Sequence, residues 1–182
     1  RRYSSAASDV YKRQLFDNED VTSQKTETRN ISQVFQFPVI YNTMSVYDNL
    51  AFPLKCRDFE KNKIEERVQS VSETLNLSSF LNMPARKLTA DQKQLISLGR
   101  GLVREDVAAV LMDEPLTVID PDLKFRLRRN LKEINEEYKT TLVYVTHDQN
   151  EAMTFADNII VMDQGEIVQV LSLIHISEPT RP

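Results

Sequence analysis

Apolar residues run without interruption through positions 107–112, and Asp113, Glu114 and Pro115 follow directly. Such a run, with charge on both sides, is typical of a strand buried on both faces of a parallel sheet. Proline has no N–H to give to a ladder, so Pro115 ends this strand. An ordinary buried strand entering a polar turn would have the same pattern. However, ligands bind at the carboxyl ends of strands in open α/β sheets, where two carboxylates suit a metal-bound phosphate.

Two further strands are predicted to end in polar side chains. A run of β-branched and aromatic residues that starts at Ile31 ends at Gln36, and a strand predicted at 141–146 is followed by His147. The right-handed crossover rule makes the second of these parallel to the central strand. We therefore expect Gln36, Glu114 and His147 to meet at one edge of a single sheet. Taken singly, the glutamine and the histidine would be ordinary polar residues at strand ends.

Helices are predicted where apolar residues recur every three or four positions. Thr89 and Gln92 fit the capping-box pattern, which starts a helix through about Arg104. Gly99 and Gly101 inside it indicate close packing against a neighbour. Two other helices have apolar stripes that predict a buried face. In the first, the stripe consists of Ile64, Val68, Val71 and Leu75. The second helix starts at Asp120-Pro121; its buried face consists of Leu123, Leu127, Leu131, Ile134 and Tyr138, and its solvent face carries Arg126, Arg128, Arg129 and Lys132.

The remaining stretches give weaker patterns. Residues 41–53 mix apolar and polar positions and are predicted to form an irregular surface element. Near the end of the chain we expect a short helix at 149–156. Strands at 159–162 and 166–170 should then form a hairpin around Gly165.

Composition narrows the possible functions. The chain has 182 residues with 23 basic and 27 acidic side chains, and this net charge of -4 gives no electrostatic reason to expect nucleic-acid binding. The one cysteine, Cys56, excludes an internal disulfide framework and favours a reducing compartment. No apolar run approaches the roughly 20 residues that span a bilayer. If the protein acts at a membrane, we therefore expect it to dock there. The 3 glycines are not arranged as in a G-x-x-x-x-G-K-[ST] phosphate loop.

The two ends of the chain lack a pattern that joins them to their neighbours. Residues 1–14 and 171–182 resemble translated sequencing-adaptor DNA around a truncated reading frame, and ordinary tails are the alternative. We therefore expect the native domain to cover 15–170, and we give His175 no role.

The ordered set of motifs resembles an ATP-binding-cassette ATPase over residues 15–170. The segments that carry the resemblance are FQ ending at Gln36, LTADQ, LMDEP, TVIDP and VTHD. The resemblance implies an α/β fold of the P-loop NTPase type, with a parallel sheet, a helical subdomain at about 42–104 and no N-terminal phosphate-loop part. VYDNLAFPLK is similar to the sugar and polyol importers, and LTADQKQLISLGRGLV to paired subunits of glycerol-type importers.

The resemblance also implies roles for individual residues, with ATP and Mg²⁺ as cofactors. Gln36 would sense Mg²⁺ and the attacking water and would couple to the membrane partner. Asp113 would be the carboxylate on the Mg²⁺ side, and Glu114 the catalytic base. Asp120 would contact the second subunit, and His147 would face the γ-phosphate. The phosphate-binding loop should lie upstream of residue 15, so residues 15–170 alone are not expected to bind ATP normally.

The family's usual LSGGQ signature is altered in this chain. The matching residues are Leu88, Thr89, Ala90, Asp91 and Gln92, so both glycines are replaced. The resemblance implies that this segment meets the γ-phosphate bound by the opposite subunit, so the Asp91 carboxylate would face a polyanion. At about 4 Å and a dielectric near 20, a pair of like charges costs about 4 kcal/mol. A helix dipole returns only about 0.3–1 kcal/mol, so repulsion is expected to dominate unless Asp91 turns away to cap its own helix. We therefore expect a heterodimer, in which Glu114 and His147 serve an active site completed by the partner's intact signature, and LTADQ completes a weak or silent one.

The resemblance implies partners as well. These are transmembrane permease subunits, a second ATPase subunit and, indirectly, a solute-binding protein, with the chain at the cytoplasmic face of the plasma membrane. One alternative is a soluble cassette ATPase that acts on the ribosome or on DNA, although the insert from Gln36 to Leu88 is too short for the long coiled coils of DNA-repair relatives. Another is a non-catalytic regulatory partner, which the presence of Glu114 and His147 disfavours.

Overall fold

A computed structural model describes residues 13–16, 18–138 and 140–173, and for residues 122 and 133–138 only the backbone. Three parallel strands form its sheet in the order β3-β4-β5, namely β3 (Ile31–Val34), β4 (Ala109–Asp113) and β5 (Thr141–Val145). β4 is central, and Asp113 at its end pairs with Val145. The predicted parallel sheet with its apolar central strand is therefore confirmed.

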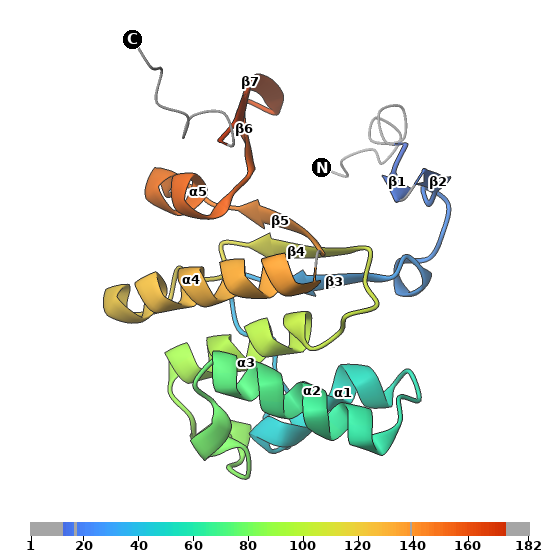
Figure 1. Ribbon diagram of the computed structural model, residues 1–182, viewed down its shortest axis with the longest axis vertical. Coiled ribbons are helices and arrows are strands. Elements are labelled where there is room, and N and C mark those ends of the chain that lie inside the picture. The colour runs from blue at the N-terminus through green and yellow to red at the C-terminus, as the bar shows by residue number, and fades with distance from the viewer. Residues whose placement is uncertain (1–12, 17, 139, 174–182) are drawn as a thin grey trace, which may run out of the picture.

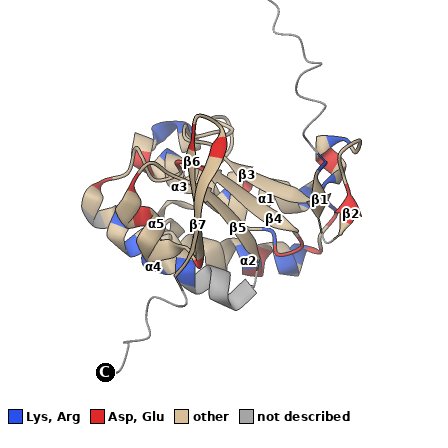
Figure 2. Ribbon diagram, turned by 90° about the horizontal axis from the view of Figure 1, so that it is seen from above, with Lys and Arg blue, Asp and Glu red and all other residues tan. Residues whose placement is uncertain are grey.

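The helices that connect β3 to β5 along the chain lie on one side of this sheet in two tiers (Figure 1). The tier next to the sheet contains α3 (Ala90–Leu102) and α4 (Pro121–Tyr138), and the outer tier contains α1 (Val46–Lys55) and α2 (Lys61–Thr74). Short 3-10 turns link them at Ser78–Phe80 and Ala85–Lys87. Figure 2 shows that charged residues lie mainly on helices and loops, while the strands of the sheet carry few of them.

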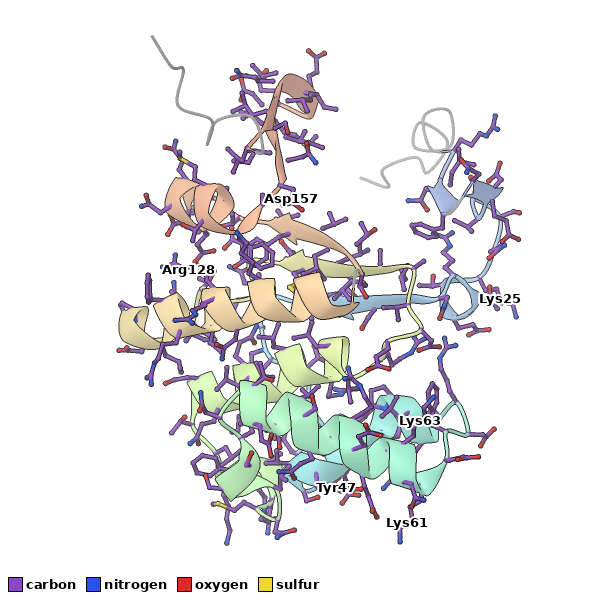
Figure 3. The ribbon with its side chains drawn as sticks, viewed as in Figure 1. Lys25, Tyr47, Lys61, Lys63, Arg128 and Asp157 are labelled. Carbon is purple, nitrogen blue, oxygen red and sulfur yellow. The ribbon has the colours of Figure 1, made fainter. Side chains whose placement is uncertain are left out.

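The predicted stripe of α2 is buried as expected. Ile64, Val68, Val71 and Leu75 are at most 6% exposed. Lys63 points away from this stripe into solvent (Figure 3). The amphipathic pattern alone therefore placed this helix correctly.

The prediction of an irregular element at 41–53 was wrong, because most of this stretch belongs to α1. Ser45 caps the helix by accepting a hydrogen bond from the Asp48 N–H at 3.0 Å. Val46, Leu50 and Leu54 recur every four residues and are fully buried. Pro53 lies in the last turn, so the one hydrogen bond that it removes leaves most of the helix intact.

The glycines of α3 allow the close packing that the sequence indicates. A Cβ atom at Gly99 would lie 2.6 Å from Leu50 Cδ2, and one at Gly101 would collide with the side chain of Val34. Real Cβ atoms essentially never approach so closely. The helix is thus pressed against α1 on one side and β3 on the other.

The prediction for α4 holds in part. The helix begins at Pro121, and Leu127 and Leu131 are fully buried. The predicted core positions Ile134 and Tyr138 lie outside the residues whose side chains are described. Arg128 is partly buried, which corrects its assignment to the solvent face, and its positive charge partly offsets the rise in the pKa of Tyr144 on β5.

The chain ends in small antiparallel units. α5 (Gln149–Phe155) leads to the hairpin of β6 (Asn158–Asp163) and β7 (Glu166–Ser172), and β1 (Leu15–Phe16) pairs with β2 (Glu19–Asp20) near the other end. A 3-10 turn at Thr26–Thr28 precedes β3. β7 continues two residues into the segment 171–182 that we expected to be foreign. Most of that segment, including His175, and residues 1–12 of the segment 1–14 lie outside the described residues.

Within the described ranges, the structure contains no helix that is both long and apolar enough to cross a membrane.

Candidate functional site

The carboxyl ends of the three parallel strands bring Gln36, Glu114 and His147 together. The Nε2 of Gln36 donates a hydrogen bond to Glu114 Oε2 at 3.0 Å. The Nδ1 of His147 lies 2.7 Å from Glu114 Oε1. Each residue follows a different strand of one sheet, so the convergence expected from the parallel topology is present in the structure.

The backbone at Glu114 is bent into an unusual conformation that aims this carboxylate. Its φ of 43° lies in the left-handed region, which residues other than glycine populate sparsely. Holding a residue there costs about 1–3 kcal/mol. The Glu114 N–H donates to the carbonyl of Val145 at 2.9 Å, which ties the turn to β5. Thr117 Oγ1 donates to Glu114 Oε2 at 3.1 Å. The turn thus fixes the carboxylate from both its backbone and its side chain.

Glu114 and His147 shift each other's pKa in opposite directions. The hydrogen bond from His147 is the main cause that lowers the pKa of Glu114, with further help from Thr117. The same hydrogen bond, together with the negative charge of Glu114, raises the pKa of His147. Because the carboxylate is an acceptor, Nδ1 of His147 must carry a proton, and Nε2 is the nitrogen left for a ligand.

The carboxylate retains capacity for one more donor. An ionised carboxylate offers about four acceptor positions. Gln36, Thr117 and His147 use three of these in the structure. A water molecule at the remaining position would be polarised by Glu114, which is the task of a general base.

Asp113 and Gln36 are the residues that we expect to hold a metal. Asp113 is exposed at the end of β4, directly before Glu114. The described residues contain no group of three or more His, Cys, Asp or Glu side chains that could hold a metal by themselves. Mg²⁺ is commonly held by only one or two carboxylates together with substrate phosphates. An exposed carboxylate and an amide oxygen beside a phosphate fit this ion, provided that the nucleotide supplies further oxygens.

The altered signature residues occupy the start of α3. Thr89 Oγ1 accepts from the Gln92 N–H at 3.4 Å, and Gln92 Oε1 accepts from the Thr89 N–H at 3.1 Å. The capping box that the sequence predicts is therefore formed, and it uses both side chains within the helix end. Ala90 is exposed, and Asp91 lies in the first turn of the helix. None of the hydrogen bonds described for Thr89 and Gln92 reaches Gln36, Glu114 or His147. Asp120 is exposed, and its carbonyl accepts from the Lys124 N–H at 2.9 Å at the start of α4.

Three residues near the site were missed by sequence reasoning. Gln94 in α3 donates to the carbonyls of Phe35 and Pro115, next to Gln36 and Glu114. It shares the buried face of the helix with Leu98, so a polar residue at an apolar position was the available signal. Thr117 gave no signal of its own. The third is Glu151, which lies four residues after His147.

Glu151 supports the turn that carries His147. It is 4% exposed and accepts hydrogen bonds from Tyr144 Oη at 2.9 Å and from Thr146 Oγ1 at 3.1 Å. Burial is the main cause that raises the pKa of Tyr144, and the charge of Glu151 raises it further. Asp148, which directly follows His147, caps α5 by accepting from the Asn150 N–H at 2.8 Å.

Comparison with known proteins identifies the family. The model of the ABC transporter family matches residues 6–117. The chain belongs to this family. It is 46% identical over 142 residues to the trehalose/maltose import ATP-binding protein MalK of Thermococcus litoralis, and this match covers 78% of this chain and 38% of that protein. It is 40% identical over 166 residues to the sn-glycerol-3-phosphate import ATP-binding protein UgpC of Pectobacterium atrosepticum, and this match covers 91% of this chain and 45% of that protein. The chain thus spans less than half the length of these curated relatives.

A solved structure supports the fold of this ABC transporter family member. The cbiO1 protein of Clostridium perfringens, described as part of the ABC transporter complex cbiONQ, superposes with a TM-score of 0.76 and 24% identity. The match covers 89% of this chain and 66% of that one. The predicted α/β fold of the ABC ATPase type is therefore confirmed.

Proposed function

We propose that the chain is the ATP-hydrolysing subunit of an ABC importer, and that it couples ATP binding and hydrolysis to uptake of a carbohydrate or polyol. The hydrogen-bonded set of Gln36, Glu114 and His147 at one edge of the sheet is the observation that carries this proposal. The relatives named for import of trehalose/maltose and of sn-glycerol-3-phosphate support the solute class.

Each member of the set has a separate task in hydrolysis. Glu114 accepts a proton from the water that attacks the γ-phosphate, and Gln36 orients that water while its Nε2 holds the carboxylate. The charged imidazolium of His147 keeps its Nδ1–H on Glu114 and donates its Nε2–H to the phosphate, which stabilises the developing negative charge there. Asp113 and the Gln36 amide oxygen would hold Mg²⁺, which neutralises charge on the transferred phosphoryl group.

An exposed apolar patch beside Gln36 supports docking to a membrane subunit. Phe37, Val39, Tyr41 and Met83 form it, and each is at least 37% exposed. Tyr41 packs on Phe52 of α1 with ring centroids 4.7 Å apart, and Met83 accepts a hydrogen bond from the Val46 N–H through its carbonyl, so the patch joins the Gln36 loop to the start of α1. Apolar surface next to polar residues is typical of a protein–protein contact.

The remaining partners follow from this arrangement. We place the subunit peripherally, at the cytoplasmic face of the plasma membrane, with a solute-binding protein acting only through the permease. The self-capped, acidic helix start at Thr89–Gln92 supports pairing with a second ATPase subunit that has an intact signature. In such a heterodimer, Asp120 would lie at the contact between the subunits.

The full-length chain, co-expressed with candidate permease subunits, tests the proposal. We expect ATP hydrolysis that Glu114→Gln lowers at least about a hundredfold, as for loss of a general base, while ATP binding persists. Co-purification with membrane subunits supports the importer, whereas co-purification with ribosomes or DNA supports a soluble cassette ATPase. Hydrolysis that is unchanged in Glu114→Gln would overturn the proposed mechanism.

A further inference from the structure

Gln94 lies at the point where α3 meets both loops of the candidate site. Its side chain is completely buried. The Nε2 donates to the Phe35 carbonyl at 3.0 Å and to the Pro115 carbonyl at 2.9 Å. Phe35 directly precedes Gln36, and Pro115 directly follows Glu114. One amide group therefore binds the backbone directly next to both Gln36 and Glu114.

These two hydrogen bonds are the physical reason for an amide at this position. The neighbouring side chains Leu95, Ile96 and Leu98 are buried and apolar. The Oε1 of Gln94 is buried and has no hydrogen-bond partner among the described residues, which is unfavourable for a polar atom. A leucine of similar size would avoid this cost. The amide is thus suited to the two carbonyls, which would otherwise lose their donor.

The same helix holds the Gln36 loop at a second place. Ser97 Oγ accepts from the Val39 N–H at 3.3 Å, and the Arg100 guanidinium donates to the Val39 carbonyl. Gln36 is therefore held by α3 on both sides along the chain. Of these three α3 side chains, Gln94 alone also contacts the Glu114 turn in the described hydrogen bonds.

We propose that Gln94 is a positioning residue that sets the separation between the Gln36 amide and the Glu114 carboxylate. It ties both loops to α3, so that a movement of this helix changes the positions of both groups together. The 3.0 Å contact between Gln36 and Glu114 depends on two backbones that no ladder pairing joins, because β3 ends at Val34 and β4 at Asp113. This inference rests on the proposed role of Gln36 and Glu114 in ATP hydrolysis.

The test uses Gln94→Leu and Gln94→Glu in the full-length chain assembled with its partner subunits. Leucine removes both donors and keeps the volume, and glutamate keeps the shape with at most one donor. We expect kcat to fall about tenfold or more while KM for ATP changes little, because positioning acts in the transition state. Val71→Ala is the matched control: it trims a buried side chain of α2 that packs beside Gly99, and no hydrogen bond described for the Gln36 loop or the Glu114 turn involves Val71, so it should lower the melting temperature and leave kcat near that of the parent.

A double variant separates positioning from general structural damage. If Gln94 acts through Gln36, then Gln94→Leu added to Gln36→Ala should lower kcat much less than it does alone. The inference is overturned if the two losses multiply in full, or if kcat of both Gln94 variants falls no further than that of Val71→Ala. A parent that binds ATP but does not hydrolyse it would instead overturn the proposed function, and this inference with it.

Discussion

Glu114 and His147 lie 33 residues apart in the sequence, yet their side chains meet at 2.7 Å across the ends of β4 and β5. The contact is directional, since Nδ1 donates and the carboxylate accepts. Glu114 is also held by Gln36 and Thr117, whereas His147 is three-quarters exposed. The histidine is therefore the residue of the pair that can move toward a ligand, whereas the glutamate is held in place by its other hydrogen bonds.

The protonation of His147 gives the first prediction. Glu114 raises the pKa of His147, so its titration by NMR in the nucleotide-free protein should occur above the ordinary value of about 6.5 and return toward that value in Glu114→Gln. A raised pKa means that the pair stabilises the fold below the ordinary pKa and loses this effect as the pH rises through the folded value. Glu114, whose pKa is lowered, loses its part as the pH falls through its own folded value. An unchanged His147 titration in Glu114→Gln would contradict this account.

The altered signature gives the second prediction. Ala90→Gly combined with Asp91→Gly in the full-length pair should raise ATP turnover, because it removes from the first turn of α3 a carboxylate that is expected to repel the phosphate bound by the opposite subunit. Turnover measured by phosphate release checks this expectation. Glu66→Ala removes an acid from the exposed surface of α2 and should leave turnover unchanged. Equal turnover in the parent and the double glycine variant would count against a degenerate second site.

The apolar patch gives the third prediction. Phe37→Ser should weaken co-purification with the membrane subunits, because it removes apolar surface from the proposed contact. Phe125→Ser is a matched control on α4, since Phe125 is 67% exposed and Phe37 is 69% exposed. Binding to membrane subunits would be measured by pull-down or surface plasmon resonance. Equal loss in both variants would mean that the patch has no special part in docking.

Close packing at Gly99 gives the fourth prediction. Gly99→Ala should lower the free energy of unfolding by about 1–3 kcal/mol from overpacking against Leu50, offset by about 1 kcal/mol from the better helix propensity of alanine. Urea unfolding of the full chain measures the difference. Lys63→Ala on the exposed side of α2 should stay within about 0.5 kcal/mol of the parent. A stabilised Gly99→Ala variant would show that Leu50 moves aside at little cost.

The sequence was sufficient for the parts of the site that follow from parallel topology. Gln36, Glu114 and His147 each lie within two residues of the end of a strand, so the rule that strand ends share an edge was enough to group them. α1 was missed because Pro53 and the polar residues between Val46 and Leu54 obscured a regular four-residue stripe. The role of Gln94 could not be read from the sequence, because its partners are backbone carbonyls 59 and 21 residues away.

The buried carboxylate of Glu151 gives the last prediction. Glu151→Leu leaves the hydroxyls of Tyr144 and Thr146 without their acceptor and should lower the free energy of unfolding by about 1–3 kcal/mol for each. Glu151→Gln keeps an acceptor oxygen and should recover much of that loss. Since His147 lies between Thr146 and the cap of α5, its ring resonances should shift in Glu151→Leu and much less in Glu151→Gln. Resonances that stay in place while stability falls would show that the position of His147 is set by Glu114 alone.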